Sequence, residues 1–170
     1  MKDKLHSYFA RIRWTGNSGE GTKTYVSYKR DHEIQVDGRT AINGSSDPAF
    51  RGNPTCYSPE DLLVASLSAC HMLWYLHLCA TGGVVVTAYV DRATGTMVEK
   101  KNGGGYFKEV VLYPSITITA GSNRRSAKDL HDRAHELCFI ANSVKFPVLC
   151  KPEITVVQDH AAKEAPVSSP

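Results

Sequence analysis

Two cysteines stand out among the residues that could do chemistry, because each falls in a stretch with helical spacing. Cys70 lies within a long apolar run, and Cys138 lies on the apolar side of a later amphipathic segment. Two thiols so far apart in sequence can meet only if the two helices pack together. One interpretation makes both of them packing residues, since a buried thiol behaves as a small apolar side chain. The other is an attacking thiolate with a second cysteine that resolves its oxidised form.

A thiolate in an apolar site needs a positive charge beside it, because burial alone favours the neutral thiol. Arg51, in the loop before the apolar run, is the candidate for that charge, although its position in a loop also fits a solvated surface arginine. Glu60 could hold the guanidinium in a bidentate pair. The candidate catalytic residues are therefore Cys70, Cys138, Arg51 and Glu60.

The spacing between Glu60 and Cys70 carries a prediction about assembly. Ten residues of helix rise about 15 Å, so Glu60 does not reach the Cys70 of its own helix. If both residues work at one site, Glu60 of one chain serves Cys70 of a second chain across antiparallel central helices. The spacing by itself thus predicts a homodimer.

A second group of residues has the spacing of metal ligands. His131, His135 and Cys138 follow one another at i, i+4 and i+7, and two histidines four residues apart are a known metal pair. A zinc site needs a fourth ligand, and Asp132 stands where the usual glutamate would be. A helix face carrying histidines is more often solvated, so we expect no metal and no cofactor. A zinc-binding structural protein remains an alternative function.

The element that must position the first pair of thiols is the run Ser58–Ala80. It opens with Ser-Pro-Glu, which is typical of a helix start, and Gly82-Gly83 ends it. A helix that is apolar on nearly every side is buried, either in a membrane or in a protein core. Its serines and histidines, the strand-like segments around it and the lack of a second span favour a core helix.

The rest of the chain predicts strands around two helices. The second helix is expected near Arg124–Ile140, with Ser126 opening a capping box, and residues 43–57 form a loop. Strands are expected at Tyr8–Thr15, Thr24–Tyr28, Glu33–Val36, Val84–Val90, Thr94–Val98, Phe107–Leu112, Ser115–Thr119 and Pro152–Val157. This order indicates an α+β fold with a mainly antiparallel sheet.

Composition sets further bounds. A chain of 170 residues with 42% hydrophobic and 22% charged residues fits a single globular domain, expected over residues 1–158, with a disordered tail at 159–170. The net charge of +3, from 20 basic and 17 acidic residues, argues against nucleic acid as a partner. Five cysteines without a recognisable signal peptide indicate a reducing cytoplasm.

The two cysteine motifs resemble those of the OsmC/Ohr family, the osmotically inducible and organic hydroperoxide resistance proteins. Ser-Pro-Glu-Asp-Leu-Leu followed by Ser-Ala-Cys70-His is similar to the family's helix motif, with the cysteine ten residues after Glu60. Ala-His-Glu-Leu-Cys138-Phe-Ile-Ala-Asn-Ser is similar to its second motif, and Arg51 is the nearest match to its loop arginine. The resemblance runs to about Val157. Phe139 stands where peroxidase members often carry proline, which is closer to a less defined OsmC-like branch.

The resemblance implies an intertwined dimer, in which each subunit wraps a curved antiparallel sheet around two central helices. It implies thiol-dependent reduction of organic hydroperoxides: Cys70 becomes a sulfenic acid, Cys138 closes a disulfide with it, and a lipoyl-type dithiol reopens the bond. Arg51 and Glu60 would complete the site, and we expect apolar walls that include Leu73, Trp74 and Phe139. The alternative is a non-enzymatic dimeric module that binds an apolar small molecule and uses both cysteines for packing.

Overall fold

The computed structural model describes residues 4–157, which form two compact units, residues 4–63 and 64–157. The boundary between the units falls inside the long helix α1 (Pro59–Thr81). The tail that we expect at 159–170 lies outside the described residues. Each unit is built from elements that are close in sequence, and each is described by itself.

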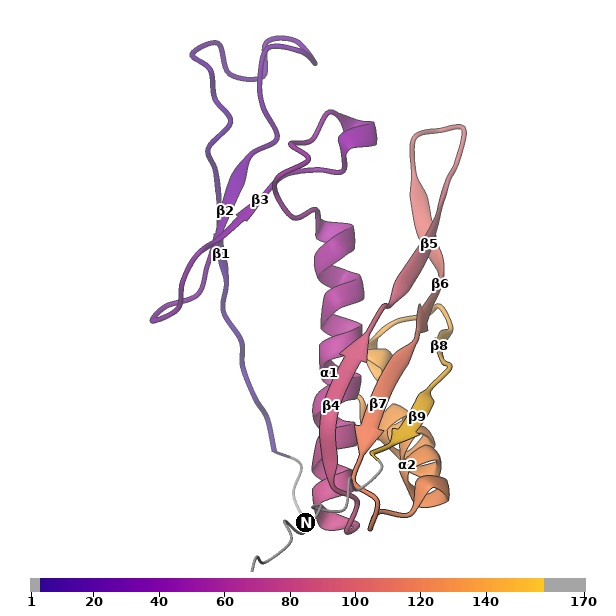
Figure 1. Cartoon of the computed structure of the whole chain (residues 1–170). Coiled ribbons are helices and arrows are strands. Elements are labelled where there is room, and N and C mark those ends of the chain that lie inside the picture. Colours follow the sequence, from indigo (N-terminus) through magenta and orange to yellow (C-terminus); the bar gives the residue numbers. More distant parts are fainter. Residues whose placement is uncertain (1–3, 158–170) are drawn as a thin grey trace, which may run out of the picture. The chain divides into compact units, whose positions relative to one another are not determined.

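The first unit is an antiparallel meander. Its strands are β1 (Arg11–Trp14), β2 (His32–Gln35) and β3 (Ile42–Gly44), in the sheet order β1-β2-β3 (Figure 1). The short helix η1 (Pro48–Phe50) follows in the loop that leads to α1. The predicted meander is thus confirmed for its first and third strands, and β3, which begins at Ile42, extends into the segment 43–57 that we expected to be a loop.

The strand predicted at Thr24–Tyr28 is wrong, because this segment forms turns. The hydroxyl of Ser27 donates to the carbonyl oxygen of Gly21 over 3.1 Å, and the backbone N–H of Thr24 donates to the same hydroxyl over 3.0 Å. Serine side chains that bond the nearby backbone in this way compete with the hydrogen bonds of a strand. Local β propensity from the tyrosines and the valine was outweighed by that competition.

The second unit carries two three-stranded sheets, β4-β7-β9 and β5-β6-β8. Their elements are β4 (Val86–Asp91), β5 (Thr94–Glu99), β6 (Gly105–Leu112), β7 (Pro114–Ile118), α2 (Arg124–Leu137), η2 (Ala141–Ser143), β8 (Val148–Cys150) and β9 (Glu153–Val156). β4 pairs with β7 and β5 with β6 in antiparallel fashion, whereas β8 and β9 add in parallel to β6 and β7. The α+β class and the mainly antiparallel pairing are confirmed. β8 was not predicted.

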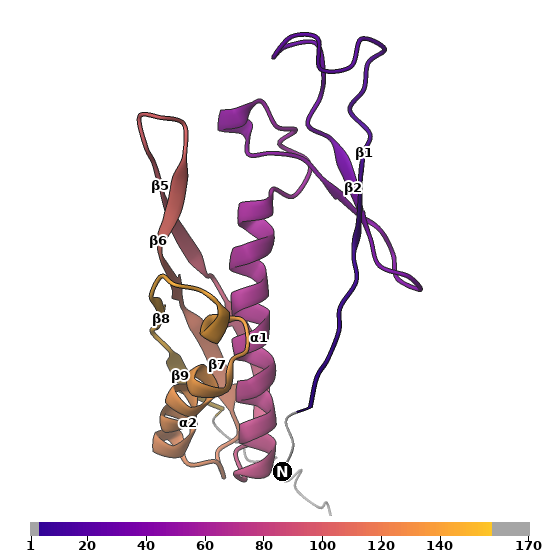
Figure 2. The same cartoon turned by 180° about the vertical axis from the view of Figure 1, so that it is seen from behind.

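Both helices lie on one face of the β4-β7-β9 sheet, as the front and back views show (Figures 1 and 2). The core between them contains Tyr75 and Cys79 of α1, Ile116 and Ile118 of β7, Ala127 and Ala134 of α2, Val84 and Ile154. Burying a large apolar side chain stabilises the fold by about 1.5–3 kcal/mol. The Tyr75 hydroxyl, which is also buried, donates to the carbonyl oxygen of Ala127 over 3.0 Å and joins the two helices.

The ends of α1 follow from its sequence. The Ser58 hydroxyl accepts from the Asp61 backbone N–H over 3.1 Å, and the Asp61 carboxylate accepts from the Ser58 backbone N–H over 2.9 Å, which is a reciprocal cap. At the other end Gly83 takes a positive φ of 74°, where glycine carries no steric penalty. The helix signals in the sequence are therefore confirmed at both termini.

The burial of α1 differs from the all-round burial that its composition predicts. Its fully buried residues form one stripe, Leu67, His71, Tyr75 and Cys79. By length and composition α1 could cross a membrane, yet only 22% of its most apolar window is buried within this chain. The stripe packs on the sheet of the same unit, which fits the interpretation as a core helix. The opposite face remains exposed in the single chain.

The second helix, α2, begins and ends differently from the prediction. Asn123 caps it by accepting from the backbone N–H of Ser126 over 3.0 Å, so the capping role that we predicted for Ser126 is wrong. The helix ends at Leu137 rather than Ile140. Cys138 has an extended backbone, with φ −69° and ψ 106°, and it terminates the helix instead of lying within it.

Candidate functional site

The second unit brings the thiols of Cys70 and Cys138 together. Cys70 is half-buried on α1, while Cys138 is only 1% exposed at the end of α2, and both are free thiols. Burial and a hydrogen bond with the Cys70 side chain raise the pKa of Cys138 to about 11. The backbone N–H of Ala141 donates to the Cys138 sulfur over 3.5 Å and holds it in place. The end of α2 thus presents one thiol to a second thiol on the middle of α1.

These surroundings give the two thiols different chemical roles. With a pKa of about 11, Cys138 is a neutral thiol at physiological pH. A neutral thiol is a poor first nucleophile, because the thiolate is the reactive form. Cys70 is the more accessible of the two and is the thiol that an incoming substrate meets. The arrangement suits attack by Cys70 followed by a later step at Cys138.

An apolar groove of about 620 Å³ runs along α1 beside Cys70. Its lining residues are Ser66, Ala69, Cys70, Leu73, Trp74, His77 and Phe139. The rings of Trp74 and Phe139 meet edge to face with centroids 5.7 Å apart. The predicted walls Leu73, Trp74 and Phe139 are confirmed as lining residues. A groove of this composition can take up the hydrocarbon part of a ligand next to a thiol.

Arg51 lies in the first unit, in a loop that is held by specific backbone geometry. It follows η1 with a positive φ of 65°, and its guanidinium lies over the ring of Tyr25 at 5.9 Å. Asp47 caps η1 by accepting from the backbone N–H of Ala49 over 2.7 Å. A Cβ on Gly52 would lie 1.5 Å from the carbonyl oxygen of Ser46, so only glycine fits there. The loop presents an exposed cation from a fixed turn.

Glu60 lies in the first turn of α1 and is half-buried. Across residues 4–157, the ion pairs of the chain do not include one between Glu60 and Arg51. Of the four predicted catalytic residues, the structure brings Cys70 and Cys138 together in the second unit. Arg51 and Glu60 belong to the first unit, and their roles stay predictions.

The alternative zinc set of His131, His135 and Cys138 is wrong within the described part of the chain. His131 is 2% exposed and turns into the core, whereas His135 is exposed to solvent. Cys138 lies past the end of α2 beside Cys70. The three side chains therefore do not meet at one point, because His131 faces the interior whereas His135 faces solvent.

Sequence reasoning missed a different cluster, which contains Cys150. Its sulfur lies 3.5 Å from Nε2 of His71 and 3.8 Å from Nδ1 of His131. His71 also shares a hydrogen bond with His131, across 3.0 Å between Nε2 and Nδ1. No spacing in the sequence could reveal the cluster, since its members come from α1, α2 and β8.

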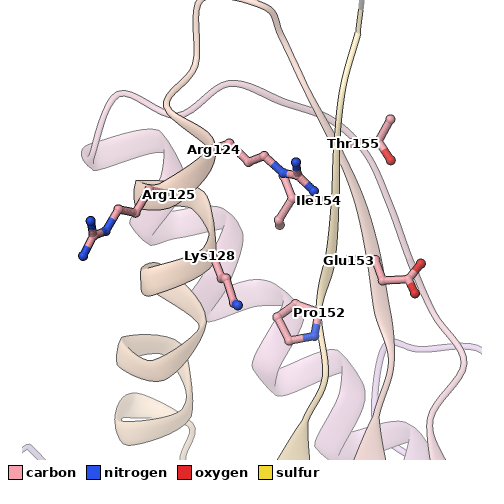
Figure 3. A pocket seen from close by; sticks show the side chains of 7 residues that line it. All are labelled: Arg124, Arg125, Lys128, Pro152, Glu153, Ile154 and Thr155. Atoms are coloured by element: carbon pink, nitrogen blue, oxygen red, sulfur yellow. The ribbon is translucent and has the colours of Figure 1, made fainter.

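A second hollow, of about 780 Å³, lies between the start of α2 and β9. Figure 3 shows Arg124 and Lys128 reaching from α2 toward β9, while Arg125 points away from the strand. The remaining lining residues are Pro152, Glu153, Ile154 and Thr155. None of these side chains is a thiol or an imidazole, so the groove beside Cys70 remains the candidate site for redox chemistry.

Comparisons with known proteins agree on one family. The family model for OsmC-like proteins matches residues 52–153 of this chain. An OsmC-like protein of unknown function from Vibrio cholerae is 31% identical and aligns with a TM-score of 0.79 over 88% of this chain and 100% of its own.

More distant structures share the fold. An organic hydroperoxide resistance protein from Elizabethkingia anophelis is 20% identical, with a TM-score of 0.66 over 92% of this chain and 100% of its own. An OsmC-like protein from Mycoplasma pneumoniae is 14% identical, with a TM-score of 0.66 over 90% of this chain and 99% of its own. A sequence search of curated proteins returned no match.

Proposed function

Because this chain belongs to the OsmC-like protein family, we propose that it is a thiol-dependent peroxidase that reduces organic hydroperoxides through Cys70 and Cys138. The observation that carries the proposal is the contact between these two thiols beside an apolar groove. Organic hydroperoxide resistance proteins among the fold neighbours support the same chemistry. We place the activity in the cytoplasm, where reductants keep the five thiols reduced.

The first step is attack by the Cys70 thiolate on the distal oxygen of the hydroperoxide. An S–O bond forms while the O–O bond breaks, so the sulfur is oxidised by two electrons and the peroxide is reduced. The leaving alkoxide takes up a proton and departs as the alcohol, and Cys70 is left as a sulfenic acid. Arg51 stabilises the thiolate and the charge on the departing oxygen, and Glu60 orients the guanidinium.

The second step joins the two cysteines. The sulfur of Cys138 attacks the sulfenic sulfur of Cys70, the S–O bond breaks, and water leaves with the thiol proton of Cys138. The high pKa of Cys138 keeps this thiol protonated until Cys70 has been oxidised. An external dithiol of the lipoyl type then reopens the disulfide by exchange and is itself oxidised to a cyclic disulfide.

A homodimer is part of the proposal. The exposed face of α1 is apolar, with Leu73 63% exposed, and only 22% of the most apolar window of the helix is buried within its own chain. A second copy of the chain would cover this face and supply Arg51 and Glu60 to the Cys70 of its partner. Light scattering should give twice the chain mass at micromolar concentration. A stable monomer with full activity would contradict this part of the proposal.

Replacing the attacking thiol tests the chemistry. Cys70→Ser should lower dithiol-dependent turnover of cumene hydroperoxide by at least about a thousandfold, because removing a nucleophile removes the covalent route. Cys56→Ser is a matched control, since Cys56 is also half-buried but lies in the first unit. Turnover that is unchanged in Cys70→Ser would overturn the proposal.

The apolar lining of the groove also favours a second candidate, a dimeric module that binds an apolar small molecule without catalysis. Its signature is saturable binding of an apolar fluorescent probe that Leu73→Ala weakens, in a protein that shows no hydroperoxide turnover. Rapid oxidation of Cys70 by an organic hydroperoxide argues against this candidate.

A further inference from the structure

Three atoms of the kind that bind metal ions meet inside the second unit. Nε2 of His71 lies 3.0 Å from Nδ1 of His131, and the sulfur of Cys150 lies 3.5 and 3.8 Å from these two nitrogens. The residues come from α1, α2 and β8, so the packing of three elements creates the cluster. Among the described residues, this is the one group of three or more such side chains whose ligand atoms converge.

The dimensions of the cluster fit a metal ion. A point at the centre of a triangle with these sides lies about 2 Å from every corner, close to the usual Zn–N and Zn–S bond lengths of about 2.0–2.1 and 2.3 Å. The two rings are nearly parallel, at 8°, with their facing nitrogens 3.0 Å apart, so an ion slightly above the plane would require each imidazole to turn until its lone pair points at the ion. In the free chain, hydrogen bonds between the two histidines and from the thiol to their nitrogens account for these distances, and a bound ion would replace all three contacts.

We propose that His71, His131 and Cys150 bind a transition-metal ion of the zinc class, with water in the fourth position. Two imidazoles and a thiolate are the donors that such ions prefer. Cys150 is half-buried rather than sealed, so an ion could approach the cluster from the side of the thiol. The site does not depend on the peroxidase proposal, since none of its residues lines the groove beside Cys70.

The protonation states favour binding by the histidines. Burial lowers the pKa of His71 to about 4 and that of His131 to about 3, so both rings are neutral at physiological pH and offer lone pairs. Burial raises the pKa of Cys150 to about 12, so the free site holds a protonated thiol. A metal ion must displace that proton, and each ion bound should release one proton.

Negative charge near the cluster favours a cation. The charge of Asp91 opposes part of the lowering of the His71 pKa that burial and His135 cause, and the charges of Asp91 and Asp132 add to the effect of burial in raising the pKa of Cys150. The Asp91 carboxylate is fixed by the Ser68 hydroxyl at 2.5 Å and by the Tyr113 backbone N–H at 2.7 Å. The titratable groups that act on the cluster from the surrounding elements are Asp91, Asp132, His135, Tyr75 and Tyr89.

The histidine pair is not satisfied by its own hydrogen bond. Nδ1 of His71 and Nε2 of His131 are buried without a partner among the described residues. Whichever ring donates the shared proton, one of these outer nitrogens carries a hydrogen that no acceptor receives. An unmade hydrogen bond of this kind costs about 1–3 kcal/mol. Binding through the two inner nitrogens would place a hydrogen on each outer nitrogen, and metal–ligand bonds would have to offset the cost of both, which is within reach because structural zinc sites contribute about 10 kcal/mol or more.

Titration of the metal-free full-length chain with Co²⁺ tests the proposal. We expect one Co²⁺ per chain, a thiolate-to-cobalt charge-transfer band in the near ultraviolet, and loss of that band when Zn²⁺ displaces the cobalt. Cys150→Ser should abolish the band and weaken binding by at least about a hundredfold, since even an outer-shell partner contributes 10- to 100-fold. Cys138→Ser should retain the charge-transfer band and the wild-type affinity for Co²⁺. Circular dichroism checks that each variant is folded.

Three results would overturn the proposal. They are a band that persists in Cys150→Ser, a band that is lost in Cys138→Ser, and no binding by the wild type at millimolar Co²⁺ or Zn²⁺. Should Cys150→Ser fail to fold, alkylation of the wild type decides: Zn²⁺ should slow the modification of Cys150 as read by mass spectrometry, and no protection contradicts the site. Affinity should rise about tenfold from pH 6 to pH 7 because one proton leaves.

Discussion

Cys70 and His71 are neighbours in the sequence, yet α1 directs them into different surroundings. Cys70 is half-buried at an apolar groove, whereas His71 is 1% exposed in a polar cluster with His131 and Cys150. Successive residues of an α-helix point about 100° apart, so one helix can serve two faces at once. The groove is open to a ligand with a hydrocarbon tail, and the cluster holds polar atoms at fixed distances inside the unit.

Each of these two faces of α1 meets a second thiol, Cys138 at the groove and Cys150 at the cluster, and the two thiols have different neighbours. Burial is the main reason why the pKa of Cys138 is raised to about 11 and that of Cys150 to about 12. Cys138 has another sulfur as its neighbour, while Cys150 has two imidazole nitrogens. A raised pKa therefore does not distinguish a redox partner from a metal ligand, and the identity of the nearest atoms does.

The largest expected effect distinguishes the role of Cys138 from that of Cys150 by the disulfide that forms after oxidation. After exposure to one equivalent of an organic hydroperoxide, the wild type should contain a Cys70–Cys138 disulfide. Cys138→Ser should contain none and should instead hold Cys70 as a sulfenic acid that a dimedone-type reagent traps. Cys150→Ser should form the disulfide as the wild type does. Peptide mapping by mass spectrometry provides the measurement. A disulfide between Cys70 and Cys150 would contradict the assignment of Cys138, and not Cys150, as the redox partner.

The buried histidines should make the second unit sensitive to acid. Their native pKa values of about 4 and 3 lie below the ordinary value of 6.5, so the unfolded chain binds more protons as the pH falls through that range. Stability is therefore present above pH 6.5 and is lost toward pH 4. Each histidine contributes about 1.4 kcal/mol per pH unit in this window.

Urea unfolding between pH 6.5 and pH 5 would measure this loss. His131→Gln should show roughly half the slope of the wild type, because only His71 then changes its protonation. His77→Gln is the control, since His77 is exposed on the groove side of α1 and should leave the slope unchanged. A pH-independent free energy of unfolding in the wild type would show that the cluster is already charged or bound in the native state.

The smallest effect concerns substrate choice at the groove. Leu73→Ala should raise KM for cumene hydroperoxide about tenfold, because losing a few methyl groups from an apolar pocket costs about 1–3 kcal/mol. Turnover of hydrogen peroxide should change little, since this substrate has no tail to bind. Equal changes for both substrates would mean that Leu73 supports the thiols instead of contacting the substrate.

Much of the fold could be predicted from local patterns. Ser-Pro-Glu and the glycine pair located both ends of α1, and helical spacing located α2 to within a few residues of its end. The expectation that Leu73, Trp74 and Phe139 form apolar walls was confirmed because residues that lie within one helical turn of Cys70, or next to Cys138 in the chain, stay close to those thiols in the fold. The turn at Thr24–Tyr28 and the cap at Asn123 were missed, since each depends on hydrogen bonds between a side chain and the nearby backbone that compete with propensity.

The sequence by itself predicted the α+β class from local patterns, and its two cysteine motifs, through their resemblance to the OsmC/Ohr family, indicated the family and the pair Cys70 and Cys138. The tertiary structure alone decided that Cys150 joins His71 and His131, and that His135 does not. The side chains of α1, α2 and β8 meet only through the packing of the second unit, and no periodicity along the chain encodes a contact between residues 71, 131 and 150. Short-range spacing fixes which face a residue takes, and long-range packing fixes what that face meets.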